Sequence, residues 1–277
     1  MSVYEITDKK SIEPLFEDWQ ETMIWSCLQN YMGKAYGVHM ESPKSPKFPK
    51  PPKSAKIIIA DFCFLAGEEN EELVKHWSEE ITSNFLIMIP EHEGWSQMIE
   101  QVWKGEATRR TRYAIKKEKD IFDREKLIEI AASIEEPFAL KLIDEELYHQ
   151  IMGESWCRDL CGQFHTYEDY KTRGIGVAAV KDGIVVSGAS SYTVYRDGIE
   201  IEIDTKEEYR RKGLALACGA GLILECLDRG LYPSWDAQNP GSVALAKKLG
   251  YHFDYEYPVY EIEREAADKT EQFLTGK

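Results

Sequence analysis

The chain has 277 residues and a mass of 31.9 kDa, with 43% hydrophobic residues, which suffices for two domains or one large domain. Lysine and arginine number 34 against 49 aspartate and glutamate residues, so the net charge is −15 and the pI is near 5.0. This balance argues against general binding to nucleic acids or anionic membranes, because both need a net basic face. No signal peptide opens the chain and no apolar run approaches the ~18 residues of a membrane span, so we expect a cytoplasmic protein.

The first half of the sequence, residues 1–136, predicts an N-terminal α/β lobe without a catalytic signature. Helical spacing over 12–32 is followed by a Pro/Lys-rich stretch, 42–56, that predicts an exposed loop because proline removes backbone donors. The remaining apolar patterns predict strands at 57–65, 85–89 and 111–115, and helices at 68–82, 95–103 and 123–133.

One stretch of this lobe, 104–119, is locally basic. We interpret it as a solvated surface that pairs with the acidic remainder of the chain. A patch for nucleic acid or an acidic partner is the alternative.

A second domain is predicted over residues 137–277. Two Asp-Gly turns predict successive antiparallel strands in its middle, and Asp144 is placed to cap a helix. The expected strands are 138–143, 176–180, 184–195, 199–205, 233–236 and 252–262, and the expected helices are 145–151, a broken stretch over 155–170, 213–229 and 240–249.

Two neighbouring patterns in this domain carry chemistry. Because side chains alternate along a strand, Glu200, Glu202 and Asp204 of the segment IEIEIDT share one face, either as a solvated edge or as carboxylates beside a cleft. The turn that follows, Arg210-Arg211-Lys212-Gly213, begins a long helix, whose free N–H groups and dipole bind anions. The alternative for this turn is a basic first turn whose small residues serve packing.

Together these patterns resemble the GNAT superfamily of N-acetyltransferases. Arg210-x-x-Gly213-x-Ala215 after an acidic strand is similar to the superfamily's acyl-CoA signature, and Asn239 followed by a helix ending in Lys-Leu-Gly-Tyr is similar to its second signature. The resemblance covers about 137–264 and in wording is nearest to the zwittermicin A resistance acetyltransferase-like subgroup. It implies an α/β (α+β) fold with a mixed, mostly antiparallel central sheet flanked by helices.

The resemblance implies acetyl-CoA as the acyl donor. Its pyrophosphate would lie on the backbone of 211–215, and its pantetheine arm would lie between the strand at 203–205 and Asn239. The expected cofactor-binding residues are Ile203, Asp204, Thr205, Arg210, Arg211, Lys212, Gly213, Leu214, Ala215, Asn239 and Ser242.

An amine is protonated at neutral pH, so it must lose a proton before it attacks the thioester directly in a ternary complex. Glu202 is the first choice as general base, with Glu200 and Asp204 beside it, because neighbouring like charges raise the pKa of a carboxyl group. Many superfamily members use a Tyr in the last helix to protonate the leaving thiolate, but Ala246 stands at that position. The sequence leaves four substitutes open: Tyr251, Tyr255, Tyr257 and His252.

Acceptor contacts are expected from Trp156 and Asp159, and from Trp235 and Asp236, which either touch the substrate or wedge two strands apart. The acidic cleft predicts a cationic small-molecule amine as the acceptor, with no nucleic-acid or membrane partner and with a homodimer left open. Cys157, Cys161 and His165 recur every four residues, but three ligands do not complete a zinc site, so no metal is expected.

Two other functions compete with this N-acetyltransferase. The first is a non-catalytic acyl-CoA-binding or regulatory module, since the cofactor slot can persist without chemistry. The second is a resistance protein that sequesters its ligand without consuming acetyl-CoA.

Overall fold

The computed structural model describes residues 2–39, 51–78, 81 and 84–264. The chain divides into two compact units: unit 1 contains residues 1–18, 33–110 and 258–277, and unit 2 contains residues 19–32 and 111–257. This division differs from the predicted boundary after residue 136, because 19–32 and 111–136 are part of unit 2. Contacts between distant segments decide it, and composition along the chain does not reveal such contacts.

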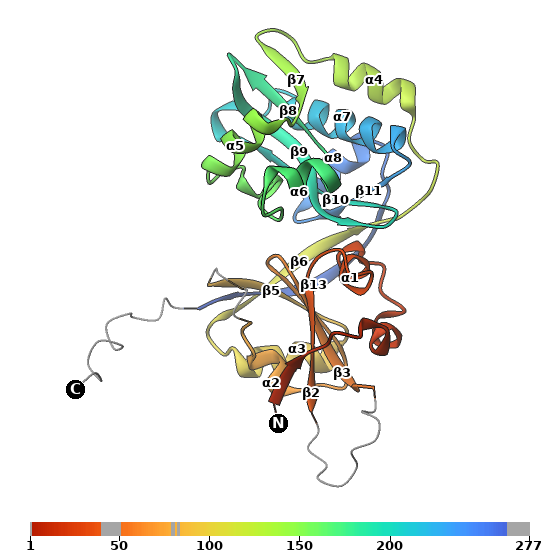
Figure 1. The fold of residues 1–277 in the computed structure, drawn as a ribbon, viewed down its shortest axis with the longest axis vertical. Helices are drawn as coiled ribbons and strands as arrows, with labels where there is room; N and C mark the ends of the chain where they lie inside the picture. Colours follow the sequence, from red (N-terminus) through yellow and green to blue (C-terminus); the bar gives the residue numbers. More distant parts are fainter. Residues whose placement is uncertain (1, 40–50, 79–80, 82–83, 265–277) are drawn as a thin grey trace, which may run out of the picture. The chain divides into compact units, whose positions relative to one another are not determined.

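Unit 1 is built on a sheet with the strand order β1-β2-β3-β4-β5-β13 (Figure 1). Its neighbouring strands are antiparallel except for β4 and β5, which are parallel. The strands are β1 (Ser2–Glu5), β2 (Lys34–His39), β3 (Ser54–Ile59), β4 (Phe62–Gly67), β5 (Phe85–Pro90) and β13 (Phe253–Glu263), and the helices are α2 (Glu71–Lys75) and α3 (Glu93–Val102).

Four predictions for residues 1–136 are corrected. The single strand predicted over 57–65 is a hairpin of β3 and β4, which turns at Ala60 with a φ of 51°. The helix predicted over 68–82 ends at Lys75, and the helical stretch 12–32 is a 3-10 turn η2 (Glu13–Phe16) followed by α1 (Thr22–Leu28). Of the predicted loop 42–56, residues 42–50 lie outside the described residues, and Ser54 already begins β3.

Unit 2 contains a five-stranded sheet in the order β11-β10-β9-β8-β7. All its neighbouring pairs are antiparallel except β10 and β11, which are parallel, so the predicted mixed, mostly antiparallel sheet is confirmed. The strands are β7 (Phe138–Leu142), β8 (Gly176–Lys181), β9 (Ile184–Tyr195), β10 (Gly198–Thr205) and β11 (Tyr232–Ser234).

Helices cover both faces of this sheet (Figure 1). On one face, Ile203 of β10 packs against Gly219 of α7, and α4 lies beside α7. On the other face, Thr22 of α1 donates a hydrogen bond to Glu200 of β10. The helices of unit 2 are α1, α4 (Arg124–Ala132), α5 (Glu145–Gly153), α6 (Tyr167–Arg173), α7 (Leu214–Asp228) and α8 (Pro240–Lys248), and the 3-10 turns are η3 (Arg158–Leu160) and η4 (Glu207–Tyr209).

The strands β10 and β11 part after three residue pairs. Their register runs from Gly198 opposite Tyr232 to Glu200 opposite Ser234. The chain then leaves the sheet at Asp236, where β12 (Asp236–Ala237) pairs with β6 (Ala107–Ile115) instead, so the strand predicted over 233–236 is two strands. Among the described ladders, β10 therefore has no strand beside this edge from 201 to 205.

Candidate active site

Three carboxylates occupy the face of β10 that looks towards α1. Glu200 is 3% exposed, and one of its oxygens, Oε2, accepts a hydrogen bond from Thr22 Oγ1. Glu202 and Asp204 are half-buried further along the strand. The alternation of IEIEIDT thus places the predicted carboxylates on one face, as expected for a strand.

The pKa values of two of these groups lie in the range useful for proton transfer. Burial raises the pKa of Glu202 to about 8, and the charges of Asp204 and Asp159 act in the same direction. Burial likewise raises the pKa of Asp204 to about 6, again with a contribution from Asp159. The packing of η3 on β10 brings Asp159, a predicted acceptor contact, to this pair. A carboxyl group that titrates near neutral pH is suited to general acid or base catalysis.

The first turn of α7, which follows β10 in the chain, has the features of an anion-binding cradle. Arg211 and Gly213 both have left-handed backbone angles, with φ values of 62° and 79°, and no side chain caps the helix. A Cβ on Gly213 would meet no atom within 4 Å, so the space in front of it is open. Arg210 donates to the carbonyl of Thr205 at 3.3 Å and ties this turn to β10. Free N–H groups and three exposed cations fit a pyrophosphate.

The other predicted cofactor and acceptor residues lie around the start of α8. Asn239 Oδ1 caps this helix by accepting from the backbone N–H of Ser242 at 3.0 Å. Trp235 donates from Nε1 to Ser242 Oγ at 3.1 Å, is 4% exposed, and packs edge-on against Tyr251. This placement favours the wedge alternative for Trp235. The partly buried Trp156 packs on the core of unit 2, and its contact with an acceptor stays a prediction.

Asp236 has no free carboxylate oxygen. Arg112 Nε donates to Asp236 Oδ1 at 2.6 Å, and the Tyr257 hydroxyl donates to Oδ2 at 2.8 Å. Both members of the ion pair are shielded, with side-chain exposures of 11% for Arg112 and 2% for Asp236. The structure therefore makes Asp236 a partner of Arg112 and Tyr257, and its contact with an acceptor stays a prediction.

Sequence reasoning missed two charged residues beside this pair. Glu21 is 5% exposed, and burial raises its pKa to about 8, while the charge of Lys117 opposes the increase. Both residues line a pocket of about 240 Å³ in unit 2. Lys117 and Arg112 belong to the basic stretch interpreted as a solvated surface that pairs with acidic residues. Arg112 is buried, so it is not solvated, but it does pair with Asp236, and Lys117 is half-buried. Nothing in the local sequence distinguishes them from their exposed neighbours.

The four candidate proton donors differ in their accessibility. Tyr251 is buried and donates to the carbonyl of Pro233 at 2.6 Å, and Tyr257 donates to Asp236. Tyr255 is 49% exposed and lines the 240 Å³ pocket. His252 is exposed and lies 2.6 Å from Glu118. Tyr255 and His252 are therefore the accessible members of the group.

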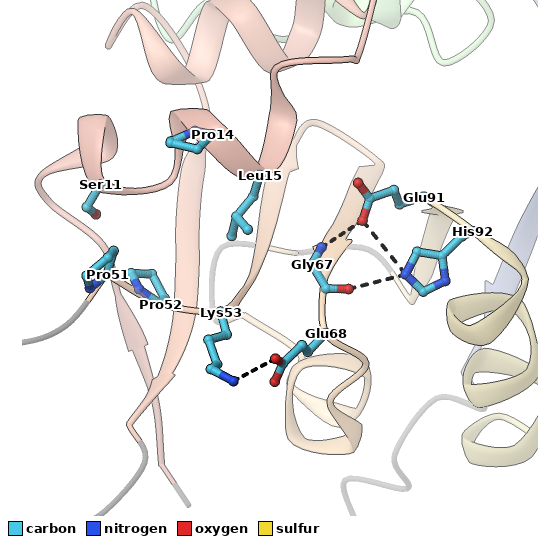
Figure 2. A pocket seen from close by; sticks show the side chains of 10 residues that line it. All are labelled: Ser11, Pro14, Leu15, Pro51, Pro52, Lys53, Gly67, Glu68, Glu91 and His92. Atoms are coloured by element: carbon cyan, nitrogen blue, oxygen red, sulfur yellow. Dashed lines mark hydrogen bonds and ion pairs between the residues drawn. The ribbon is translucent and has the colours of Figure 1, made fainter.

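Unit 1 contains a larger hollow, of about 770 Å³, shown in Figure 2. Its charged side chains have partners within the hollow: Lys53 donates to Glu68 at 2.7 Å, and Glu91 accepts from the backbone N–H of Gly67 at 2.7 Å. His92 lies against the carbonyl of Gly67. These groups are exposed or half-exposed, and the described residues that line the hollow include no buried carboxylate.

The described residues contain no group of three or more His, Cys, Asp or Glu side chains that could hold a metal ion. Cys157 and Cys161 are buried thiols on either side of η3, and they do not share a helix face with His165. Within the same described residues, no helix has the length and apolar character to cross a membrane.

Residues 13–260 match the family model of the GNAT acetyltransferases. The match includes the separated strands β10 and β11, the carboxylates of β10 and the uncapped first turn of α7. The chain belongs to this family. The match begins far upstream of residue 137, so the family pattern includes segments of both units. Membership supports acetyltransferase activity, as the resemblance implied.

Individual GNAT proteins resemble the whole chain. A GCN5-related N-acetyltransferase-like protein from Streptococcus suis 89/1591, known from its crystal structure, is 42% identical with a TM-score of 0.83, over 92% of this chain and 98% of that one. The uncharacterized N-acetyltransferase YdfB of Bacillus subtilis is 26% identical over 92% of this chain and 97% of its own length. A tandem GNAT protein from the clavulanic acid biosynthesis pathway, at 9% identity and a TM-score of 0.55, shares the fold.

Proposed function

We propose that this protein transfers an acetyl group from acetyl-CoA to the amine of a small cationic molecule. One observation carries the proposal: the carboxylates of β10 lie beside a strand edge that loses its partner after Glu200, and the same strand leads to the uncapped turn of α7. The proposed proton acceptor, the unpaired edge of β10 and the anion-binding turn thus follow one another along β10 and into α7. The −15 charge supports a cationic acceptor and no nucleic-acid or membrane partner. The cytoplasmic setting is proposed separately from the charge.

The residues present fit the acyl donor, which supplies a thioester-activated acetyl group when bound. The N–H groups at the start of α7 would hold the pyrophosphate, with Arg210, Arg211 and Lys212 neutralising its charge. The backbone of 203–205 would pair with the pantetheine arm along the free edge of β10. Asn239 would contact that arm from the start of α8. We also propose the zwittermicin A resistance acetyltransferase-like subgroup, from the similarity of short sequence motifs.

Glu202 would remove the proton from the acceptor. The ammonium group would give one proton to the Glu202 carboxylate, and the nitrogen would bond to the acetyl carbon as the carbon–sulfur bond breaks. The second nitrogen proton would pass to solvent or to the group that protonates the departing thiolate. Only ionised Glu202 can accept a proton, so with a pKa of about 8 we expect kcat/KM to rise with pH and to level off above about 8. Tyr255 or His252 would protonate the thiolate, unless the thiolate leaves unaided.

The test measures release of free thiol from acetyl-CoA with a panel of amines. Because general base catalysis contributes about 10²- to 10⁴-fold, Glu202→Gln should lower kcat/KM by at least about 100-fold and remove the rise towards pH 8. The matched control is Glu207→Gln, an exposed carboxylate of η4, which should leave both unchanged.

Other results would support the competing functions. Thermal stabilisation by acetyl-CoA without thiol release from any acceptor would favour a non-catalytic acyl-CoA module. Stoichiometric binding of an amine without use of acetyl-CoA would favour sequestration. Absence of stabilisation at saturating acetyl-CoA would overturn the cofactor assignment.

A further inference from the structure

The 240 Å³ pocket of unit 2 is walled by a carboxylate whose hydrogen bonding is incomplete. Glu21 lines the pocket and is 5% exposed, yet its Oε2 has no hydrogen-bond partner among the described residues. Glu200, 3% exposed, has an unpartnered Oε1 as well. Buried polar atoms are nearly always paired, because an unpaired one costs free energy. Glu21 Oε2 therefore has no donor among the described residues, whereas Glu200 has the Ser234 hydroxyl close by. Burial raises the pKa of Glu200, and the hydrogen bond from Ser234 opposes the increase.

A cation lines the same pocket. The Lys117 ammonium has one hydrogen bond in the described structure, a long one of 3.5 Å to the carbonyl of Ile115, and no carboxylate within 4 Å. Burial lowers the pKa of Lys117, but the charges of Glu21, Glu200 and Asp236 outweigh it, so the net direction is upward and the ammonium stays charged. The pocket therefore presents an acidic and a basic side chain that interact through their charges but form no ion pair within 4 Å in the described structure.

The charged residues at the rim of the pocket do not neutralise Glu21 or Lys117. Glu118 is turned towards His252 at 2.6 Å, while Asp254 and Lys116 are both exposed at the rim and carry opposite charges. Tyr255 supplies a half-exposed aromatic wall. Of the charged residues that line the pocket, Glu21 and Lys117 therefore have the least complete hydrogen bonding.

We propose that this pocket is the acceptor site and that it takes a primary amine that also bears a carboxylate, as a free amino acid does. Glu21 and Glu200 receive the ammonium group, and Lys117 receives the carboxylate. The volume is below the range of pockets for drug-sized molecules, which begins at about 300 Å³, and suits a ligand of amino-acid size. The inference rests on the proposed function, whose acceptor it specifies.

Strand β10 connects the pocket to the proposed base and to the proposed cofactor site. Thr22, next to Glu21, donates to Glu200, which places Glu200 directly behind the pocket wall. Glu202 follows Glu200 on the same face, about 6–7 Å along the strand. Glu200 is also the last residue of β10 that pairs with β11. An amine held at Glu200 therefore lies beside the base and at the point where the cofactor slot opens.

The experiment compares three matched sets of acceptors: L-amino acids, their amides, and the amines left by their decarboxylation. We expect kcat/KM for the best amino acid to exceed that for its amide and its amine by at least tenfold. Lys117→Met should abolish this preference, and Glu21→Gln should lower transfer to all three at least tenfold. Lys119→Met, an exposed lysine outside the pocket, is the matched control and should change neither.

The outcomes separate the inference from the function on which it rests. If wild type transfers acetyl groups but treats the three sets alike, or if the preference survives in Lys117→Met, the acceptor assignment is overturned and the acetyltransferase stands. If no acceptor releases thiol, the proposed function fails, and thermal shifts with the same compounds test the pocket: stabilisation by amino acids alone, lost in Lys117→Met, supports it, and any other pattern overturns it. Stabilisation by acetyl-CoA checks the folding of each variant, and Lys117→Met decides alone if Glu21→Gln does not fold.

Discussion

Strand β6 carries two arginines that show how the units differ. Arg110, in unit 1, lies 2.9 Å from Glu261, with side-chain exposures of 59% and 25%. Arg112, in unit 2, lies 2.6 Å from Asp236, with exposures of 11% and 2%. The same residue type on one strand is solvated in one unit and shielded in the other. In unit 2, the Arg112–Asp236 ion pair is shielded from water near the point where β10 and β11 separate.

The hollows of the two units repeat this contrast. The hollow of unit 1 is about three times larger, at 770 Å³ against 240 Å³, but its charged groups are solvated and paired. The small pocket of unit 2 is lined by a buried carboxylate oxygen that has no hydrogen-bond partner among the described residues. Incomplete hydrogen bonding, and not size, is therefore the reason why we propose this pocket as the acceptor site.

The largest expected effect tests the two ion pairs. Arg112→Met should lower the free energy of unfolding by about 3–5 kcal/mol, because Asp236 would stay buried without its cation. Arg110→Met makes the same chemical change at an exposed pair and should cost less than about 1 kcal/mol. Urea denaturation measures both. Equal losses would show that the shielding of the pair in unit 2 has no energetic consequence.

The next effect tests the cradle on α7. Gly213→Ala should raise the KM for acetyl-CoA about tenfold, or about 1.4 kcal/mol, because a methyl group would project into the open space where the pyrophosphate is expected. A left-handed alanine also costs about 1–2 kcal/mol of stability.

Gly105 of unit 1 provides the matched control for this variant. Its φ is +89°, and a Cβ there would also meet no atom within 4 Å. Gly105→Ala should therefore cost similar stability in urea denaturation and leave the KM unchanged. A similar KM change in both variants would remove the cradle's role.

Local patterns in the sequence predicted much of unit 2. The alternation of IEIEIDT placed Glu200, Glu202 and Asp204 on one face, and the Asp-Gly turns predicted the antiparallel order of β8, β9 and β10. These features depend on residues close together in the chain. The turn at Ala60 escaped prediction because no glycine or asparagine marks it.

Burial of charge depends on distant segments and could not be predicted in this way. Glu21 precedes α1, Lys117 follows β6, and Glu200 lies on β10, so their proximity arises only when these elements pack. The basic stretch around Lys117 has the composition of a solvated surface. The sequence therefore indicated the proposed base and the proposed cradle but not the proposed acceptor pocket.

A smaller expected effect is a difference between the two units in how a buried titratable group makes the free energy of unfolding depend on pH. The pKa of Glu21 in unit 2 is raised to about 8, so the folded state holds an extra proton between about pH 4.5 and 8, and stability falls as pH rises through that window. Burial lowers the pKa of Lys56 in unit 1 to about 8, so its contribution is lost as pH falls from about 10.5 through 8. Each slope is at most about 1.4 kcal/mol per pH unit.

Denaturation between pH 5 and 10 should resolve the two contributions. Glu21→Gln should make the decline below pH 8 less steep, because Glu202 and Asp204 still contribute to it, and should leave the rise above pH 8. Lys56→Met should do the reverse, since Lys56 has 0% exposure and donates to the carbonyls of Leu73 and His76. If both variants alter the same arm of the curve, the two buried groups do not titrate separately.

The smallest effect concerns the large hollow of unit 1. Lys53→Gln removes an ion pair to Glu68 whose members are 65% and 64% exposed, so stability should change by less than about 1 kcal/mol. Glu91→Gln removes the charge that faces the N–H of Gly67, and neither variant should change kcat/KM for acetyl transfer by more than about twofold, a difference of about 0.4 kcal/mol. A tenfold loss in either variant would place a binding function in unit 1, because solvated pairs of this kind have no other route to the reaction.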